Sequence, residues 1–154
     1  MKKIVLLSHC VMNPFCELPE APETLRKPIL DTFLRKGWGI IQLPCPELCY
    51  QSLERSSIYV TDEEAAPYRL YCKKLLQPLI KNIGEYNIHG IKVGGIVGID
   101  TSPSCSVIDQ DAIMMQVLLD QLNEIKSGEI QRIDTPIDDD IDMDIFLDDL
   151  ASWQ

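Results

Sequence analysis

Four short stretches of the chain carry runs of apolar residues and predict β-strands. Residues 2–8 (KKIVLLS) form an apolar run between polar residues, which is typical of a strand buried on both faces of a parallel sheet. Three later stretches are interpreted as strands as well: 38–44 (WGIIQLP), 92–100 (KVGGIVGID) and a short last one, 130–136 (IQRIDTP).

Between these strands, apolar residues recur at the spacing of an α-helix. Leu25, Ile29 and Phe33 fall on one helical face, and Gly37 marks the end of that helix. The predicted helices span residues 23–37, 62–87 and 110–128. Pro78 lies inside the second of them and is expected to kink or divide it, because proline lacks a backbone N–H and clashes with the preceding turn.

The order of these elements predicts the fold class. Strands that alternate with helices of these lengths indicate an α/β protein, in which a parallel sheet lies between two layers of helices in a Rossmann-like arrangement. We expect a single domain over residues 1–154, with loops at 10–22, 45–61 and 101–107.

The net charge of −10 lies mainly at the C-terminal end. Eight aspartates and no Lys or Arg fall between Asp134 and Asp149, so the segment 134–154 is acidic. Apolar residues such as Leu150 and Trp153 predict that it ends in a short helix docked on the core. A calcium loop of the EF-hand type would need a glycine at its turn and a glutamate at its end, and this segment has neither. Because an acidic chain repels phosphate backbones, nucleic acid is not an expected partner.

The apolar runs are too short for a membrane protein. A membrane-spanning helix needs about 20 apolar residues, and the run Ile4–Leu7 is shorter than the roughly 7–15 residues of a signal peptide. We therefore expect a cytoplasmic protein without a membrane partner. In that compartment the six cysteines are expected to be buried, catalytic or metal-bound rather than paired in disulfides. Cys72, within a helical pattern, is interpreted as a core residue.

Three other cysteines follow three predicted strands. Cys10, Cys45 and Cys105 come directly after the first, second and third strands. Because the carboxyl ends of parallel strands lie at one edge of the sheet, where such folds bind ligands, we expect the three thiols to converge. Three thiolates at one edge suit a soft metal or an iron–sulfur cluster.

Two other interpretations of these cysteines remain open. A closed zinc site needs a fourth ligand, and Cys16, Cys49 and His9 are near in sequence. The spacings do not match a zinc finger or ribbon, and no Cys-x-x-Cys occurs. In the second interpretation, the three cysteines bind no metal and are only small residues that pack at the strand ends.

Three motifs in order resemble a known family. The segments LLSHCVMNPFC (6–16), PCPE (44–47) and SPSC (102–105) resemble the family that includes the 2-thiouracil desulfurases, and the similarity of arrangement covers roughly residues 1–110. The resemblance implies a desulfidase that removes sulfur from a small thiolated molecule. It also implies a 4Fe–4S cluster held by three cysteines, with one iron left open to the substrate's sulfur.

Carried over to this chain, the resemblance assigns specific residues to the site. The cluster ligands would be Cys10, Cys45 and Cys105, and the acid–base pair would be Glu47 and Ser102. From the residues alone, Glu47 could equally cap a helix or face solvent, and Ser102 could be only a turn residue. A cluster- or metal-binding protein without catalysis is therefore the alternative function.

The chain departs from that family after two of the motifs. The family usually continues its Cys-Pro-Glu with Gly-Gly-Leu and a Pro-Arg pair, whereas residues 48–57 read LCYQSLERSS; Ser106 stands where the family usually has glycine. We expect these loops to shape the pocket, so that the chemistry is shared and the substrate differs. Tyr59 and Tyr68 are interpreted as core residues rather than as a pocket for a planar ring.

The glycines of the third predicted strand do not form a nucleotide-binding motif. Gly94, Gly95 and Gly98 lie inside the strand, whereas a dinucleotide fingerprint lies between a strand and a helix. We expect them to allow close packing of a helix against the sheet.

Overall fold

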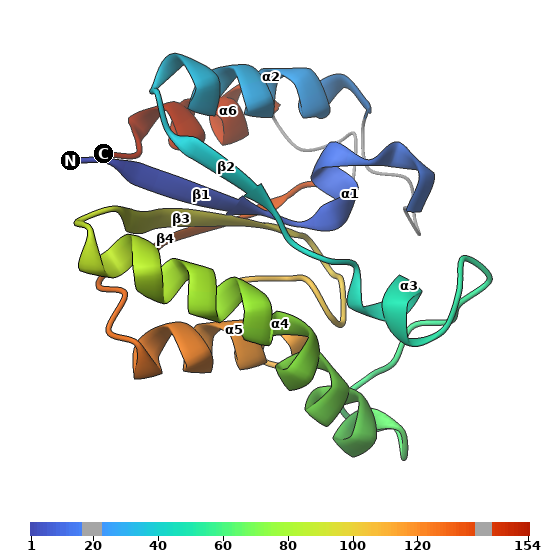
Figure 1. Ribbon diagram of the computed structural model, residues 1–154. Helices are drawn as coiled ribbons and strands as arrows, with labels where there is room; N and C mark the ends of the chain where they lie inside the picture. Colours follow the sequence, from blue (N-terminus) through green and yellow to red (C-terminus); the bar gives the residue numbers. More distant parts are fainter. Residues whose placement is uncertain (17–22, 138–142) are drawn as a thin grey trace.

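The protein contains a parallel sheet, as the sequence predicts. The computed structural model describes residues 1–16, 23–137 and 143–154. Its strands are β1 (Lys3–Leu7), β2 (Gly39–Gln42), β3 (Lys92–Ile99) and β4 (Gln131–Thr135). They are all parallel and follow the order β2-β1-β3-β4 (Figure 1).

The composition of each strand matches its place in the sheet. The central strands β1 and β3 are buried along nearly their whole length, which explains their continuous apolar sequences. The edge strands β2 and β4 are partly exposed and include polar residues such as Gln42 and Arg132. The carboxyl ends of β1 and β3 are therefore held rigidly by neighbours on both sides.

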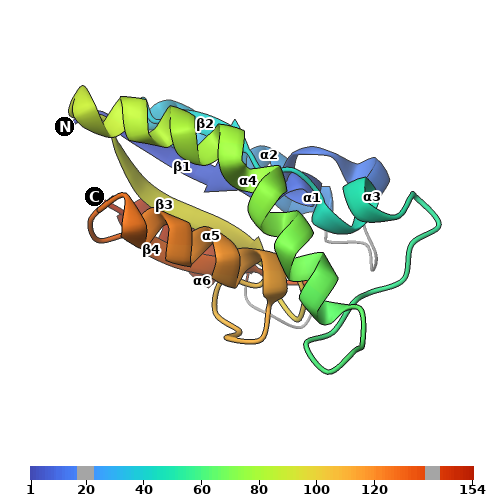
Figure 2. The same cartoon turned by 60° about the horizontal axis from the view of Figure 1, so that its bottom comes forward.

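Helices cover both faces of this sheet. They are α1 (His9–Met12), the 3₁₀ turn η1 (Pro14–Cys16), α2 (Glu23–Arg35), α3 (Pro46–Tyr50), α4 (Ala65–Ile88), α5 (Ile113–Glu124) and α6 (Met143–Ser152). Helices α2 and α6 lie on one face, and α4 and α5 lie on the other (Figures 1 and 2). The predicted three-layer α/β fold is thus confirmed.

Two predictions about local structure are wrong. The loops predicted at 10–22 and 45–61 each contain short helices, α1 and α3; Pro46 favours the second because its fixed φ suits the first helical position. Of the kink or division expected at Pro78, the division is wrong, because α4 is continuous from Ala65 to Ile88. Lys74, whose carbonyl loses its helical partner to the proline, and Pro78 itself are both exposed. Residues 17–22 of the first loop lie outside the described residues.

The C-terminal segment docks on the core, as predicted. The Lys36 ammonium donates to the carbonyl oxygens of Ala151 and Trp153, both at 2.7 Å, and so satisfies the end of α6. The Trp153 ring lies 5.8 Å from the ring of Phe33, centroid to centroid. The aspartates at 138–140 and 142 belong to the acidic segment but lie outside the described residues.

Gly94 and Gly95 make room for indole rings. A Cβ on Gly94 would stand 2.6 Å from the Trp38 ring, and one on Gly95 would stand 2.0 Å from the Trp153 ring. The predicted close packing is therefore present, but the partners are aromatic side chains rather than a helix backbone. Gly98 has a different partner, described with the site.

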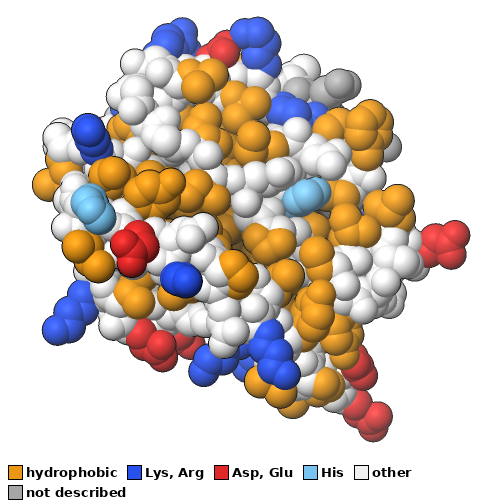
Figure 3. Space-filling model, in the orientation of Figure 1, with side chains coloured by type: hydrophobic (Ala, Val, Ile, Leu, Met, Phe, Trp, Pro, Cys, Tyr) orange, Lys and Arg blue, Asp and Glu red, His pale blue; other side chains and the backbone are white. Residues whose placement is uncertain are grey.

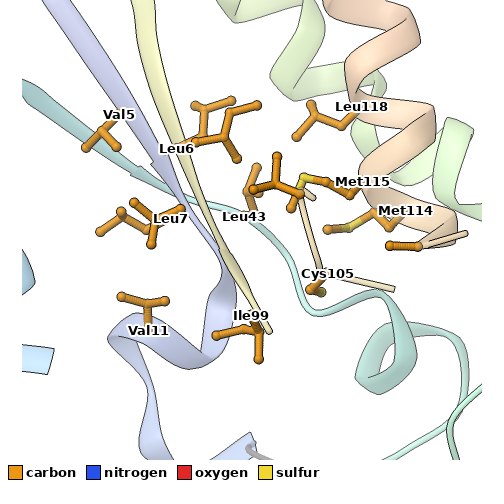
Figure 4. Close-up of a cluster of buried hydrophobic side chains, with 14 of the residues drawn as sticks. Val5, Leu6, Leu7, Val11, Leu43, Ile99, Cys105, Met114, Met115 and Leu118 are labelled. Atoms are coloured by element: carbon orange, nitrogen blue, oxygen red, sulfur yellow. The ribbon is translucent and has the colours of Figure 1, made fainter. Parts of the chain in front are cut away.

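The core extends from the sheet to the edge where β1 and β3 end. Figure 4 shows Cys105 and Ile99 at the end of this cluster, below Met114 and Met115 of α5. Cys72 is fully buried in the core, as predicted. On the face in Figure 3, side chains of both charges occur and lie mainly toward the rim. None of the described helices is long and apolar enough to cross a membrane.

Candidate functional site

The carboxyl ends of the first three strands surround a small cavity. Its volume is about 180 Å³, and its wall includes Cys10, Cys45, Cys105, Glu47 and Ser102. The convergence of three strand-end thiols, predicted from topology alone, is therefore present in the structure. The carboxyl and hydroxyl groups assigned from the resemblance lie at the same cavity.

Backbone hydrogen bonds hold the first thiol at the end of β1. The chain turns into α1 at Ser8, whose N–H donates to the Val97 carbonyl of β3 at 3.0 Å. From α2, the Arg26 guanidinium donates to the carbonyl oxygens of Cys10 and Val11, both at 3.0 Å. Cys10 is thus fixed between the sheet and α2. The second thiol, Cys45, is buried and immediately precedes α3.

The third thiol lies on a loop that folds back over β3. The N–H of Ile99 donates to the Cys105 carbonyl at 3.1 Å, and the Ser102 Oγ accepts from the N–H of Cys105 at 3.0 Å. Ser102 is therefore the turn residue that the sequence also allowed, and it still lines the cavity. Burial raises the pKa of the Cys105 thiol well above its ordinary value, and the nearby Cys10 and Cys45 add to this. Without a bound cation, this thiol stays protonated.

Asp134, at the end of β4, braces that loop from the other side. It accepts hydrogen bonds from the Val107 N–H at 2.7 Å, from the Ile108 N–H at 3.4 Å and from the Ser106 hydroxyl. Burial raises its pKa above the ordinary value, although these three donors act in the opposite direction. By sequence alone, Asp134 is one aspartate of the acidic segment. Its position at a strand end was the available signal.

Glu47 lies inside the protein and neither faces solvent nor caps α3. The residue is 9% exposed. Its Oε1 accepts a hydrogen bond from the Ser104 hydroxyl at 3.1 Å, and Ser104 is in turn 2.8 Å from the Tyr68 hydroxyl. Its Oε2 lies 3.5 Å from the Arg55 Nε. The carboxylate is therefore held from two sides at the cavity wall.

Arg55 and Tyr59 were not expected to take part in the site. The side chain of Arg55 is 4% exposed, it lines the cavity, and it donates to the carbonyl oxygen of Cys16. Its Nε has no hydrogen-bond partner among the described residues. Nothing in the segment 48–57 distinguished this arginine from a solvated surface charge. Tyr68 is a core residue, as predicted, whereas Tyr59 is half exposed and lines the cavity.

The other candidate ligands lie around the cavity without lining it. Cys16 is buried and close enough to Cys10 and Cys45 for hydrogen bonds between thiols, and burial raises its pKa to about 11. Cys49 is exposed on α3. His9 begins α1 rather than continuing the strand, and its Nε2 lies 3.5 Å from the Asn13 amide. Cys16 therefore adjoins the converging thiols, and Cys49 lies one helical turn from Cys45, to whose carbonyl its N–H donates at 3.1 Å.

The chemistry of the donor set fits an iron–sulfur cluster. Within the described residues, no group of three or more His, Cys, Asp or Glu side chains is placed to hold one ion. In a cluster each cysteine binds a different iron, so its ligands stand further apart than the ligands of one ion. Three thiols at a cavity, beside a buried arginine whose Nε makes no hydrogen bond to the described residues, fit an anionic group of thiolate-bound iron and sulfide. Bound iron would also keep the buried thiols deprotonated.

Comparison with known proteins defines the family. The chain is 31% identical over 126 residues to "Uncharacterized protein MJ0003" of Methanocaldococcus jannaschii, and the match covers 80% of each chain. This protein belongs to the same family as that archaeal protein. No protein-family model matches the chain, and no solved structure matches it significantly. The resemblance to the 2-thiouracil desulfurases stays a prediction from the motifs.

Proposed function

We propose that this protein is a desulfidase that removes sulfur from a small thiolated molecule. In this proposal Cys10, Cys45 and Cys105 hold a 4Fe–4S cluster that has one iron without a protein ligand. When bound, the cluster supplies a Lewis-acidic iron that accepts the substrate's sulfur. The observation that carries the proposal is that the three strand-end thiols and a buried carboxylate, Glu47, line one cavity.

The chain's own residues supply the proton chemistry. Replacing C=S by C=O requires a water molecule to add to the carbon and protons to move to the departing sulfur. Glu47, at the cavity wall, takes up and returns a proton in these steps, a role typically worth about 10²–10⁴ in rate. The Ser102 oxygen already accepts two backbone N–H groups, so Ser102 meets the substrate as a hydrogen-bond donor.

The fate of one substrate gives the direct test. The protein is purified and reconstituted without oxygen, and its visible spectrum, iron and sulfide are measured. Incubation with 2-thiouracil should then yield uracil and hydrogen sulfide in equal amounts, with water as the second reactant. A panel of other thiolated bases and thioamides should accompany it, because the loop 48–57 differs from the related enzymes.

The outcomes separate the two functions that the sequence left open. Cluster-dependent release of sulfide from any substrate of the panel supports the desulfidase. A stable cluster without turnover of any of them favours a cluster-binding protein without catalysis. A protein that retains neither iron nor sulfide contradicts both.

A further inference from the structure

Two buried serines flank Cys105, and each donates a hydrogen bond to a different carboxylate. Ser104 is 1% exposed and donates to Glu47 Oε1 at 3.1 Å. Ser106 is 2% exposed and donates to Asp134. Of these two serines, Ser104 is the one that connects the loop of Cys105 to Glu47, the carboxylate of the candidate site.

The hydrogen bonds of Ser104 run in one direction. The Ser104 hydroxyl donates to Glu47 Oε1, so its single hydrogen is used there. The Ser104 oxygen is then the acceptor for the Tyr68 hydroxyl, which lies 2.8 Å away. Tyr68 is fully buried, and burial raises its pKa far above the ordinary value, so it keeps its proton and acts as the donor. The chain of donors therefore runs from Tyr68 through Ser104 to Glu47.

These hydrogen bonds leave the second carboxylate oxygen of Glu47 available to a bound molecule. Among the described residues, Oε1 accepts from Ser104, whereas the partner of Oε2 is the Arg55 Nε at 3.5 Å, which is too long for a hydrogen bond. Since Glu47 and Arg55 both line the cavity, Oε2 is the oxygen available to a molecule bound there.

We propose that Ser104 and Tyr68 are positioning residues that hold the Glu47 carboxylate with Oε2 turned toward the substrate. Neither gives up its proton: Tyr68 and Ser104 orient the carboxylate, and the proton of the reaction is exchanged at Oε2. The inference rests on the proposed function and deepens it. It also gives the two serines of the SPSC motif different roles: Ser102 donates a hydrogen bond to the substrate, and Ser104 positions the base, Glu47.

The first experiment compares turnover at equal cluster content. Ser104→Ala and Tyr68→Phe each remove one hydroxyl of this hydrogen-bonded series, and Ser127→Ala is the matched control, since it removes a buried hydroxyl that contacts Asn87 and does not line the cavity. With 2-thiouracil or the best substrate of the panel, kcat should fall about tenfold or more in Ser104→Ala, within the range expected for a misplaced base. In Tyr68→Phe the kcat should fall less than in Ser104→Ala. KM should change little in both, and Ser127→Ala should keep a kcat within a factor of about two.

The second experiment needs neither cluster nor activity. In the protein without its cluster, urea unfolding midpoints are measured for Tyr68→Phe, Glu47→Gln and the double variant, and then for the same set in a Ser104→Ala background. The double variant should lose less stability than the sum of the two single losses, because both substitutions break the same series of hydrogen bonds. In the Ser104→Ala background the losses should add.

The two experiments fail in different ways. Additive losses in the parent protein, or a kcat in Ser104→Ala equal to that of Ser127→Ala, would overturn the positioning role. If no thiolated substrate is turned over but the stability losses remain non-additive, the proposed function fails. The conclusion that Tyr68 and Ser104 position Glu47 is then still supported.

Discussion

The carbonyl oxygen of Cys105 lies against Gly98 of β3, where a Cβ atom would stand 2.5 Å from it. The same Cβ would be 2.8 Å from the Val107 nitrogen and 2.2 Å from Asp134 Oδ1. Two of these three atoms are backbone and cannot rotate away. The loop that carries Cys105 can therefore fold back over the sheet only because residue 98 is glycine.

Replacing Gly98 with alanine should destabilise the protein and displace Cys105. We expect a loss of about 1–3 kcal/mol in the free energy of unfolding, as for other overpacked sites, together with a loss of cluster on reconstitution. Gly84→Ala is the matched control. A Cβ on Gly84, inside α4, meets nothing within 4 Å, so this change should raise stability by roughly 0.5–1 kcal/mol. Equal effects of the two changes on urea unfolding would contradict the account of this loop.

Removing the Asp134 carboxylate should loosen the same loop. In Asp134→Ala, the N–H of Val107 and the hydroxyl of Ser106 lose their acceptor, and each unpaired buried group costs about 1–3 kcal/mol. Asp134→Asn keeps an oxygen for the Val107 N–H, and its amide can donate to the Ser106 oxygen instead, so this change should be milder. Thermal unfolding of both variants decides the point; an Asn variant as unstable as the Ala variant would show that charge, rather than the hydrogen bonds, holds the loop.

The stability conferred by Asp134 should also depend on pH in a defined direction. Burial raises its pKa above 3.8, so the folded protein binds this proton more tightly than the unfolded chain. The resulting stabilisation is fully present below 3.8 and is lost as the pH rises through the folded pKa. Because an asparagine side chain does not titrate, wild type should lose stability relative to Asp134→Asn between acid and neutral pH. Urea unfolding of both proteins across this range should show the difference; a constant or opposite trend would be incompatible with it.

Breaking the pair of Arg55 and Glu47 should cost more than removing both partners. Each side chain is almost fully buried, so Arg55→Met or Glu47→Gln alone leaves a charge without its partner, at about 3–5 kcal/mol. The double variant should lose less than the sum of the two. Unfolding free energies of the four proteins measure this coupling, and strict additivity would mean that the 3.5 Å approach contributes nothing.

The sequence predicted the sheet well because its signals are local. The continuous apolar run at Ile4–Leu7 and the alternation of strands and helices were enough to place Cys10, Cys45 and Cys105 at one edge. The same patterns failed at α3, because a five-residue helix around Pro46 leaves no periodicity to detect.

The supporting residues of the site could not be predicted because they depend on contacts distant in sequence. Ser104 and Glu47 are 57 residues apart, and Tyr68 meets Ser104 across 36 residues. Arg55 comes from an irregular segment in which nothing marks it as buried. Topology predicts which strand ends meet, but not which side chains of the following loops turn inward.

The binding of iron by the strand-end thiols is the central claim, and it has one direct measurement. Iron and sulfide per chain are determined after anaerobic reconstitution of Cys10→Ser, Cys45→Ser and Cys105→Ser, with Cys49→Ser as the control from the same segment, because Cys49 is exposed and outside the cavity wall. The account predicts about four irons and four sulfides in wild type and in Cys49→Ser, as a 4Fe–4S cluster contains, and loss of both in the other three variants. Full iron and sulfide in Cys45→Ser, together with their loss in Cys49→Ser, would contradict it.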